Sequence, residues 1–168
     1  MLEFVREVED TERETLLVRE HEDSVELALL LPGRLLEERA DHDDDGLLQA
    51  FEGVSHFVYL AERVRMELPT TRLELELQAE VDKFVLLTHG RDRLEPLERD
   101  RLCEHLFERV SYLHHETTEE GARYRLANAL AARFVRRLDV RAPGALRERL
   151  RSFYRAGQAD KIRLASAA

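Results

Sequence analysis

The chain has 168 residues, of which 43% are apolar and 36% charged, and its net charge is −9. This length suits one domain with one core, and the apolar fraction argues against wholesale disorder. Because charged residues follow the first methionine, we expect no secretion signal, and the longest apolar runs are far shorter than a membrane span. Because the only cysteine, Cys103, lies within a helical pattern, we expect a buried, inert thiol. The composition therefore predicts a soluble, cytoplasmic protein.

The charge is distributed unevenly along the chain. From Arg123 onward there are twelve basic and three acidic residues, a net charge of +9, whereas residues 1–122 carry a net charge of −18. Such an asymmetry predicts an interaction surface, or two parts of the chain that attract each other.

Two apolar runs near the N-terminus, Thr15–Arg19 and Val25–Leu31, flank four polar residues that can turn. The second run alternates with period two, so we predict a β-hairpin that Pro32 and Gly33 end. Residues 34–40 are predicted to form a short helix and residues 41–46 a loop.

Residues 47–66 are compatible with two structures. Leu47, Phe51, Val54 and Val58 have helical spacing, but the segment around Gly53 is rich in β-branched and aromatic residues. We expect a third strand near residues 52–61.

Four helices follow in the remaining sequence. Thr71 and Glu74 have the spacing of a capping box, and an apolar stripe continues from there to Leu87. Pro96 and Pro143 suit first helical turns, and a second capping pattern begins at Thr117. The sequence thus predicts a single α+β domain over residues 1–168. A small N-terminal antiparallel sheet, the hairpin plus the third strand, packs with about four C-terminal helices; residues 1–66 are β-rich and residues 67–168 helical, with a basic C-terminal third.

One segment has the spacing of a metal-binding loop. Asp41, Asp43, Asp45, Gly46 and Glu52 occupy positions 1, 3, 5, 6 and 12 of the pattern D-x-[DN]-x-[DN]-G-x5-E. This segment resembles the EF-hand calcium loop, which implies that Asp41, Asp43, Asp45 and Glu52 ligate a divalent ion. A solvated acidic loop explains the same residues, and the resemblance covers about twelve positions without a second loop.

A second polar cluster combines residues of the predicted third strand and of the helix that begins after Thr71. If the strand faces that helix, a histidine and several carboxylates converge and could bind a divalent metal or transfer protons near neutral pH. The alternative is an exposed acidic helix face beside a histidine that hydrogen-bonds near the core. The candidate catalytic residues are Glu52, His56, Glu76 and Glu80.

The basic C-terminal third supplies the candidate interaction residues Arg133, Arg136, Arg137, Arg147 and Arg151. They could bind nucleic-acid phosphates, but we expect several of them to pair with acids of residues 1–122 or to face a second copy of the chain.

The sequence contains no P-loop, dinucleotide glycine pattern, nucleophile elbow or zinc finger. We therefore expect no cofactor apart from a possible divalent metal. The function predicted is that of a non-enzymatic interaction or regulatory protein, such as an adaptor or a small subunit of an assembly, with a protein partner or a homo-oligomer. The alternatives are a metal-dependent enzyme that uses the histidine–carboxylate cluster and a nucleic-acid-binding protein that uses the arginine-rich helices.

Overall fold

The computed structural model describes residues 5–8, 13–22, 24–33, 44–89 and 95–167, and over these residues the chain has an α+β fold. The chain divides into two compact units, Met1–Pro69 and Thr70–Ala168. No helix in the described ranges has both the length and the apolar character that crossing a membrane requires.

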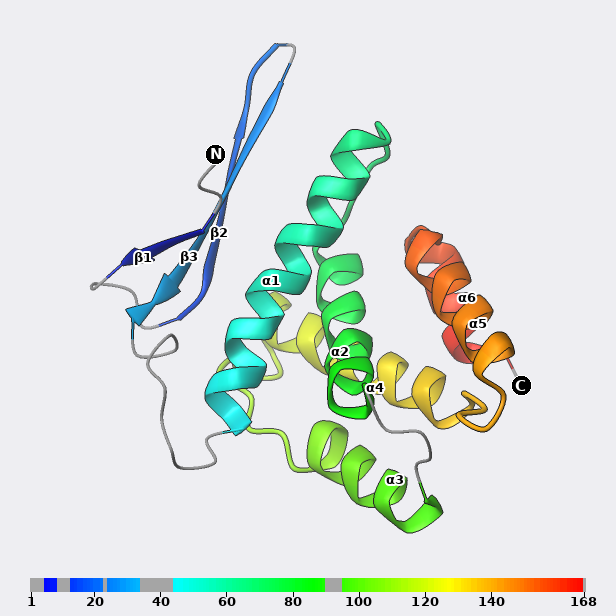
Figure 1. Ribbon diagram of the computed structural model, residues 1–168. Coiled ribbons are helices and arrows are strands. Elements are labelled where there is room, and N and C mark those ends of the chain that lie inside the picture. The colour runs from blue at the N-terminus through cyan, green and yellow to red at the C-terminus, as the bar shows by residue number, and fades with distance from the viewer. Residues whose placement is uncertain (1–4, 9–12, 23, 34–43, 90–94, 168) are drawn as a thin grey trace. The chain divides into compact units, whose positions relative to one another are not determined.

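The first unit contains a three-stranded sheet, shown in Figure 1. Strands β2 (Thr15–Glu20) and β3 (Val25–Pro32) pair antiparallel, with Thr15 opposite Leu30 and Glu20 opposite Val25. This confirms the predicted hairpin. Strand β1 (Val5–Val8) pairs parallel with β3 on its other side, so the strand order is β1-β3-β2.

Helix α1 (Asp44–Arg65) occupies the segment for which we expected a third strand, so the strand prediction for residues 52–61 is wrong. Ser55, Tyr59 and Arg63 are buried at every fourth position, which is a helical period. Packing of this face outweighs the β-propensity of the valines and aromatics, which is worth at most about 1 kcal/mol per residue. The predicted loop over residues 41–46 is also wrong from Asp44 onward, and the predicted helix over residues 34–40 lies outside the described residues.

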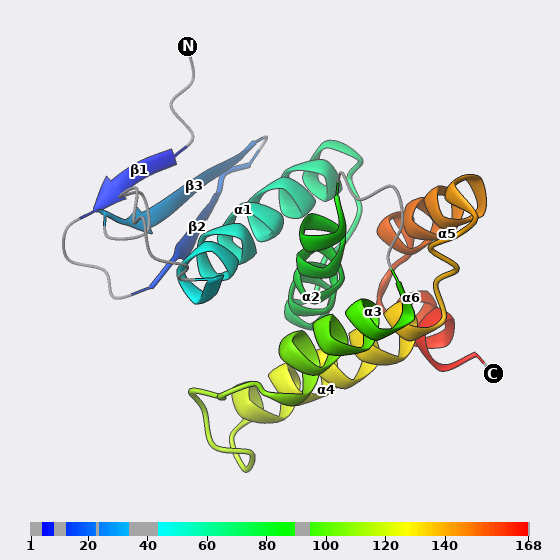
Figure 2. The same cartoon turned by 60° about the horizontal axis from the view of Figure 1, so that its bottom comes forward.

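Gly53 explains how α1 approaches the sheet of its own unit. A Cβ atom at this position would lie 3.0 Å from Glu14 Cβ and 3.0 Å from Leu29 Cδ1. The glycine that weakens the helix locally therefore serves a close approach between backbone and side chains. Figures 1 and 2 both show α1 running beside β2 and β3.

The second unit is helical. Its elements are α2 (Arg72–Thr88), α3 (Pro96–Cys103), the π-helical turn η2 (Glu104–Glu108), α4 (Glu119–Arg136), α5 (Pro143–Arg155) and α6 (Gln158–Ser166). The sequence predicted about four helices here, and the described part of this unit contains five α-helices.

Local chemistry fixes where these helices begin. The Thr71 hydroxyl accepts a hydrogen bond from the Glu74 amide at 3.2 Å, and the Glu74 carboxylate accepts one from the Thr71 amide at 2.9 Å. The predicted capping box is thus confirmed. Thr118 caps α4 by accepting from the Gly121 amide at 3.0 Å, and Pro96 and Pro143 stand in the first turns of α3 and α5.

The core of the second unit lies around α2, α4 and α6. Leu77 and Phe84 of α2 are buried, and Phe134 of α4 stacks on Phe153 of α5 with 4.0 Å between ring centroids. Lys161 of α6 is also fully buried: its Nζ donates hydrogen bonds to Gln78 Oε1 and, at 2.8 Å, to the Phe153 carbonyl. The lysine side chain therefore joins α6 to α2 and α5.

Candidate functional sites

Two of the predicted catalytic residues come together on α1. Glu52 and His56 are one helical turn apart, and each offers a ligand atom within 4.8 Å of the other. Both side chains are half-buried. A carboxylate and an imidazole at this spacing can hold one metal ion or exchange a proton.

Glu14, which the sequence did not single out, lies against the same face of α1. Its side chain is 12% exposed, and it packs at Gly53, between the turns that carry Glu52 and His56. Burial raises the pKa of the Glu14 carboxyl above its ordinary value, and the negative charge of Glu52 raises it further. A hydrogen bond from Gln49 and the charge of Arg13 act in the opposite direction. No sequence signal could place Glu14 here, because its position depends on how α1 packs on β3.

The other two predicted catalytic residues, Glu76 and Glu80, lie one turn apart on α2 in the second unit. Glu80 forms an ion pair with Lys83, with 2.9 Å between Oε1 and Nζ. Glu76 is buried, and its Oε1 lies 3.9 Å from Arg123 Nε. Both carboxylates therefore have basic partners within their own unit. The convergence of all four residues around one ion stays a prediction.

From Asp44 onward, the backbone does not have the loop geometry that the resemblance to a calcium loop implies. Asp45, Gly46 and Glu52 lie within α1, which begins at Asp44, so the chain is helical where a calcium loop turns sharply at its glycine. Asp41 and Asp43 lie outside the described residues. The loop predicted for residues 41–46, on which the calcium interpretation depended, is therefore corrected to helix from Asp44 onward.

The five predicted interaction arginines differ in their surroundings. Arg136 forms an ion pair with Glu108, and Arg137 donates to the carbonyls of Arg133 and Ala165. Arg133, Arg147 and Arg151 are exposed and form no ion pair with the described part of the chain. Among these five arginines, Arg136 alone forms the expected ion pair with an acid of residues 1–122 that the structure describes.

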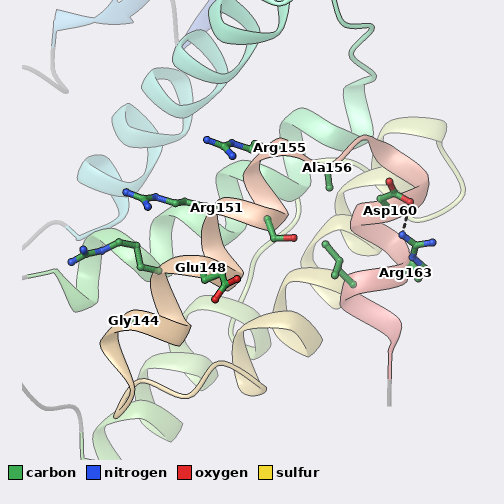
Figure 3. A pocket seen from close by; sticks show the side chains of 10 residues that line it. Gly144, Glu148, Arg151, Arg155, Ala156, Asp160 and Arg163 are labelled. Carbon is green, nitrogen blue, oxygen red and sulfur yellow. Dashed lines mark ion pairs between the residues drawn. The ribbon is translucent and has the colours of Figure 1, made fainter.

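Helix α5 carries a row of arginines beside a groove of about 780 Å³ between α5 and α6. Arg147, Arg151 and Arg155, hereafter the arginine row, follow one another at intervals of four residues and are all exposed. Figure 3 shows Arg151 and Arg155 extending in the same direction from α5, with Asp160 and Arg163 across the groove on α6. Arg163 is paired with Asp160 at 3.0 Å, whereas the arginine row forms no ion pair with residues the structure describes.

Arg155 was not among the predicted residues, although its spacing from Arg151 equals that between Arg147 and Arg151. Extending the four-residue period by one turn would have found it. The prediction used the one-turn spacing of Arg147 and Arg151 but did not extend it to Arg155.

Cys103 is buried with 3% of its surface exposed, and burial raises the pKa of its thiol. The buried position agrees with the sequence prediction. A high thiol pKa lowers the thiolate fraction at neutral pH, so nothing here favours Cys103 as a nucleophile.

Comparison with known proteins gives no assignment: no family model matches the chain, and neither a curated protein nor a solved structure matches it significantly.

Proposed function

We propose that this chain is a cytoplasmic, non-enzymatic interaction protein, an adaptor or a small subunit of an assembly, which binds an acidic protein segment through the arginine row. The observation that carries the proposal is the row itself: three exposed guanidinium groups on one side of α5 without ion pairs in the described chain. Of the residues of α5, only Phe153 is buried. Most of the helix is therefore accessible to a partner.

The spacing of the row favours a helical partner. Residues four positions apart on a helix are separated by about 6 Å along its axis. An acidic helix with a glutamate at every fourth residue presents carboxylates at the same interval, and each guanidinium can bind a carboxylate through two parallel hydrogen bonds. Because exposed ion pairs contribute about 0–1 kcal/mol each, three pairs supply selectivity and a moderate share of the affinity.

A nucleic acid fits this surface less well. Neutralising three phosphates gives a slope of only about −2.7 in log affinity against log salt, so binding should be weak at physiological ionic strength. The net charge of −9 adds repulsion toward a long polyanion. Phe134 and Phe153 are buried and cannot stack on bases.

The test compares two synthetic peptides of about 20 residues, a length that allows a stable helix. Both contain the same number of glutamates, placed in one peptide at every fourth position and in the other around all sides of the helix. Fluorescence anisotropy measures their binding to the wild-type chain, to the variant R147E/R151E/R155E and to the control variant R149E. Arg149 is an exposed arginine on the same helix but belongs to neither the row nor the groove.

We expect the aligned peptide to bind more tightly than the dispersed one. Reversal of the row should weaken binding of the aligned peptide at least tenfold, which corresponds to about 1.4 kcal/mol. R149E should bind it nearly as the wild type does. Equal affinity for both peptides, or equal effects of R149E and the triple variant, would show that the row is not a site. Tight binding of single- or double-stranded DNA at about 150 mM salt, lost in the triple variant, would favour the nucleic-acid alternative.

The second candidate function is a metal-dependent enzyme built on the predicted residues Glu52, His56, Glu76 and Glu80. The observation that favours it is the pair of ligand atoms that Glu52 and His56 bring within 4.8 Å on α1. Binding of a divalent ion is the first property that such an enzyme needs.

A further inference from the structure

The groove beside the arginine row is hollow because one of its walls carries mostly short side chains. This wall belongs to α5 and the residue that caps it, and its members follow one another at intervals of four, as the arginines do: Gly144, Glu148, Ser152 and Ala156. Leu164 of α6 lines the opposite side. Because three of these four residues have the shortest side chains, the space of about 780 Å³ can admit side chains of a partner.

Glu148 is the charged member of this wall. Across the groove, the carboxylate of Asp160 is paired with Arg163 at 3.0 Å. Glu148 is exposed and forms no ion pair with residues that the structure describes, although Arg147 and Arg151 stand one and three positions away in the sequence. Figure 3 shows the Arg151 side chain extending to one side of α5 and the Glu148 carboxylate lying apart from it. A single negative charge is therefore available to a partner next to three positive ones.

The arginine row by itself does not fix where along its length a partner helix docks. Because the arginines are equally spaced, a helix with glutamates at every fourth position can slide by four residues and lose at most one ion pair of three. An exposed ion pair changes affinity by at most about fivefold, so neighbouring registers would be populated together. One charge of opposite sign beside the row removes this degeneracy, as a single polar residue does in the interface of a coiled coil.

We propose that Glu148 selects the register of the partner by binding a lysine or arginine that the acidic helix carries beside its glutamates. The other residues of the partner that face the groove are apolar and contact Leu164, in the manner of an amphipathic helix that occupies a groove. In a register that brings a glutamate to this position, two like charges oppose each other, so the wrong alignment is disfavoured as well.

This inference rests on the proposed function, because it concerns a second property of the same partner. The arginine row supplies attraction to an acidic helix, whereas Glu148 decides which acidic helix is bound and in which alignment. The two roles are separable, since the first depends on the number and spacing of glutamates and the second on the position of one basic residue.

The experiment is a lysine scan of the aligned acidic peptide. The parent peptide has glutamine at the positions that border its glutamates, and each member of the series replaces one glutamine by lysine, so all members have the same net charge. Fluorescence anisotropy measures their binding to the wild type, to E148K and to the control variant E116K. Glu116 is an exposed acid between η2 and α4 that does not line the groove, so E116K changes the net charge of the chain by the same amount. Far-ultraviolet circular dichroism verifies that every variant is folded.

We expect lysine at one position of the scan to be bound by the wild type about three- to fivefold more tightly than lysine elsewhere. E148K should abolish that preference and should instead favour, by a similar factor, a peptide with glutamate at the same position. E116K should keep the wild-type preference, because it alters the net charge without changing the groove.

Two results would overturn the role of Glu148. One is equal affinity of the wild type for all lysine peptides, and the other is a positional preference that E148K leaves unchanged. Both differ from a failure of the proposed function, in which the parent peptide binds no better than the dispersed one. That failure would overturn the proposed function and the role of Glu148 together, whereas the first two results leave the arginine row standing.

Discussion

The polar face of α1 and the arginine row of α5 each place charged side chains along one helix, but in different surroundings. On α1, Glu52 acts on the largely buried carboxyl of Glu14, whose own pKa is raised by burial. On α5, the arginines are exposed and form no ion pair with the described residues. Buried charges affect the stability of the fold, whereas exposed charges are screened by water and affect mainly what the surface binds.

The largest effect expected from the contrast between buried and exposed charged side chains concerns two basic residues, Lys161 of α6 and Arg155 of α5. Lys161→Ala removes the donor to Gln78 Oε1 and to the Phe153 carbonyl in a buried position and leaves a cavity. We expect it to lower the free energy of unfolding by about 3 kcal/mol or more. Arg155→Ala, on the exposed row, should change it by less than about 0.5 kcal/mol.

Urea unfolding followed by circular dichroism measures both. The variant Lys161→Met keeps most of the side-chain volume and should be intermediate, which separates the lost hydrogen bonds from the cavity. Equal losses for Lys161→Ala and Arg155→Ala would show that burial does not distinguish the two basic side chains.

Smaller effects are expected at two helical glycines, where substitution by alanine should change the free energy of unfolding in opposite directions. At Gly53 an added Cβ would crowd Glu14 and Leu29 at 3.0 Å, whereas at Gly144 of α5 it would meet nothing within 4 Å. Gly144→Ala should therefore raise the free energy of unfolding by up to about 1 kcal/mol through helix propensity. At Gly53 the crowding should outweigh the gain in helix propensity, so Gly53→Ala should lower the free energy of unfolding by about 1 kcal/mol.

The measurement is again equilibrium unfolding, with the two alanine variants compared in one set of experiments. Stabilisation by both substitutions would mean that α1 does not approach the sheet of its unit as closely as the structure shows.

An effect of similar size is expected for one of two glutamates. Glu14→Gln removes a buried charge that lacks a full set of hydrogen bonds and keeps the side-chain shape, so it should raise the free energy of unfolding of the metal-free chain by roughly 1 kcal/mol. Glu148→Gln, on the exposed surface of α5, should have an effect within about 0.5 kcal/mol. Thermal unfolding in the presence of a chelator compares the two. Destabilisation by Glu14→Gln would show that the ionised carboxylate is satisfied in the folded state.

Local chemistry made part of this fold predictable. The hairpin followed from alternation in residues 25–31, and the capping box of Thr71 and Glu74 placed the start of α2. Residues 52–61 were wrongly predicted to form a strand because their β-branched and aromatic side chains favour strands locally, whereas the burial of Ser55, Tyr59 and Arg63 in the observed helix depends on tertiary packing. Strand β1 was missed for a related reason, since its parallel pairing with β3 leaves no local pattern.

The candidate sites were predictable to different degrees. Glu52 and His56 were identified from residue type, and the four-residue spacing that brings them together became visible once their segment was known to be helical. Glu14 depends on tertiary packing and could not be identified. Arg147 and Arg151 were found from the basic composition and their spacing of one helical turn, and Arg155 continues their row at the same spacing.

The most direct test of the account is a crossed titration of two variants with two acidic peptides. The variants R147E/R151E/R155E and R149E are each titrated with the aligned and with the dispersed peptide. The account predicts that the triple variant loses the preference for the aligned peptide and that R149E retains it. A folded triple variant that binds the aligned peptide as tightly as the wild type does would contradict the proposal that the arginine row is a binding surface.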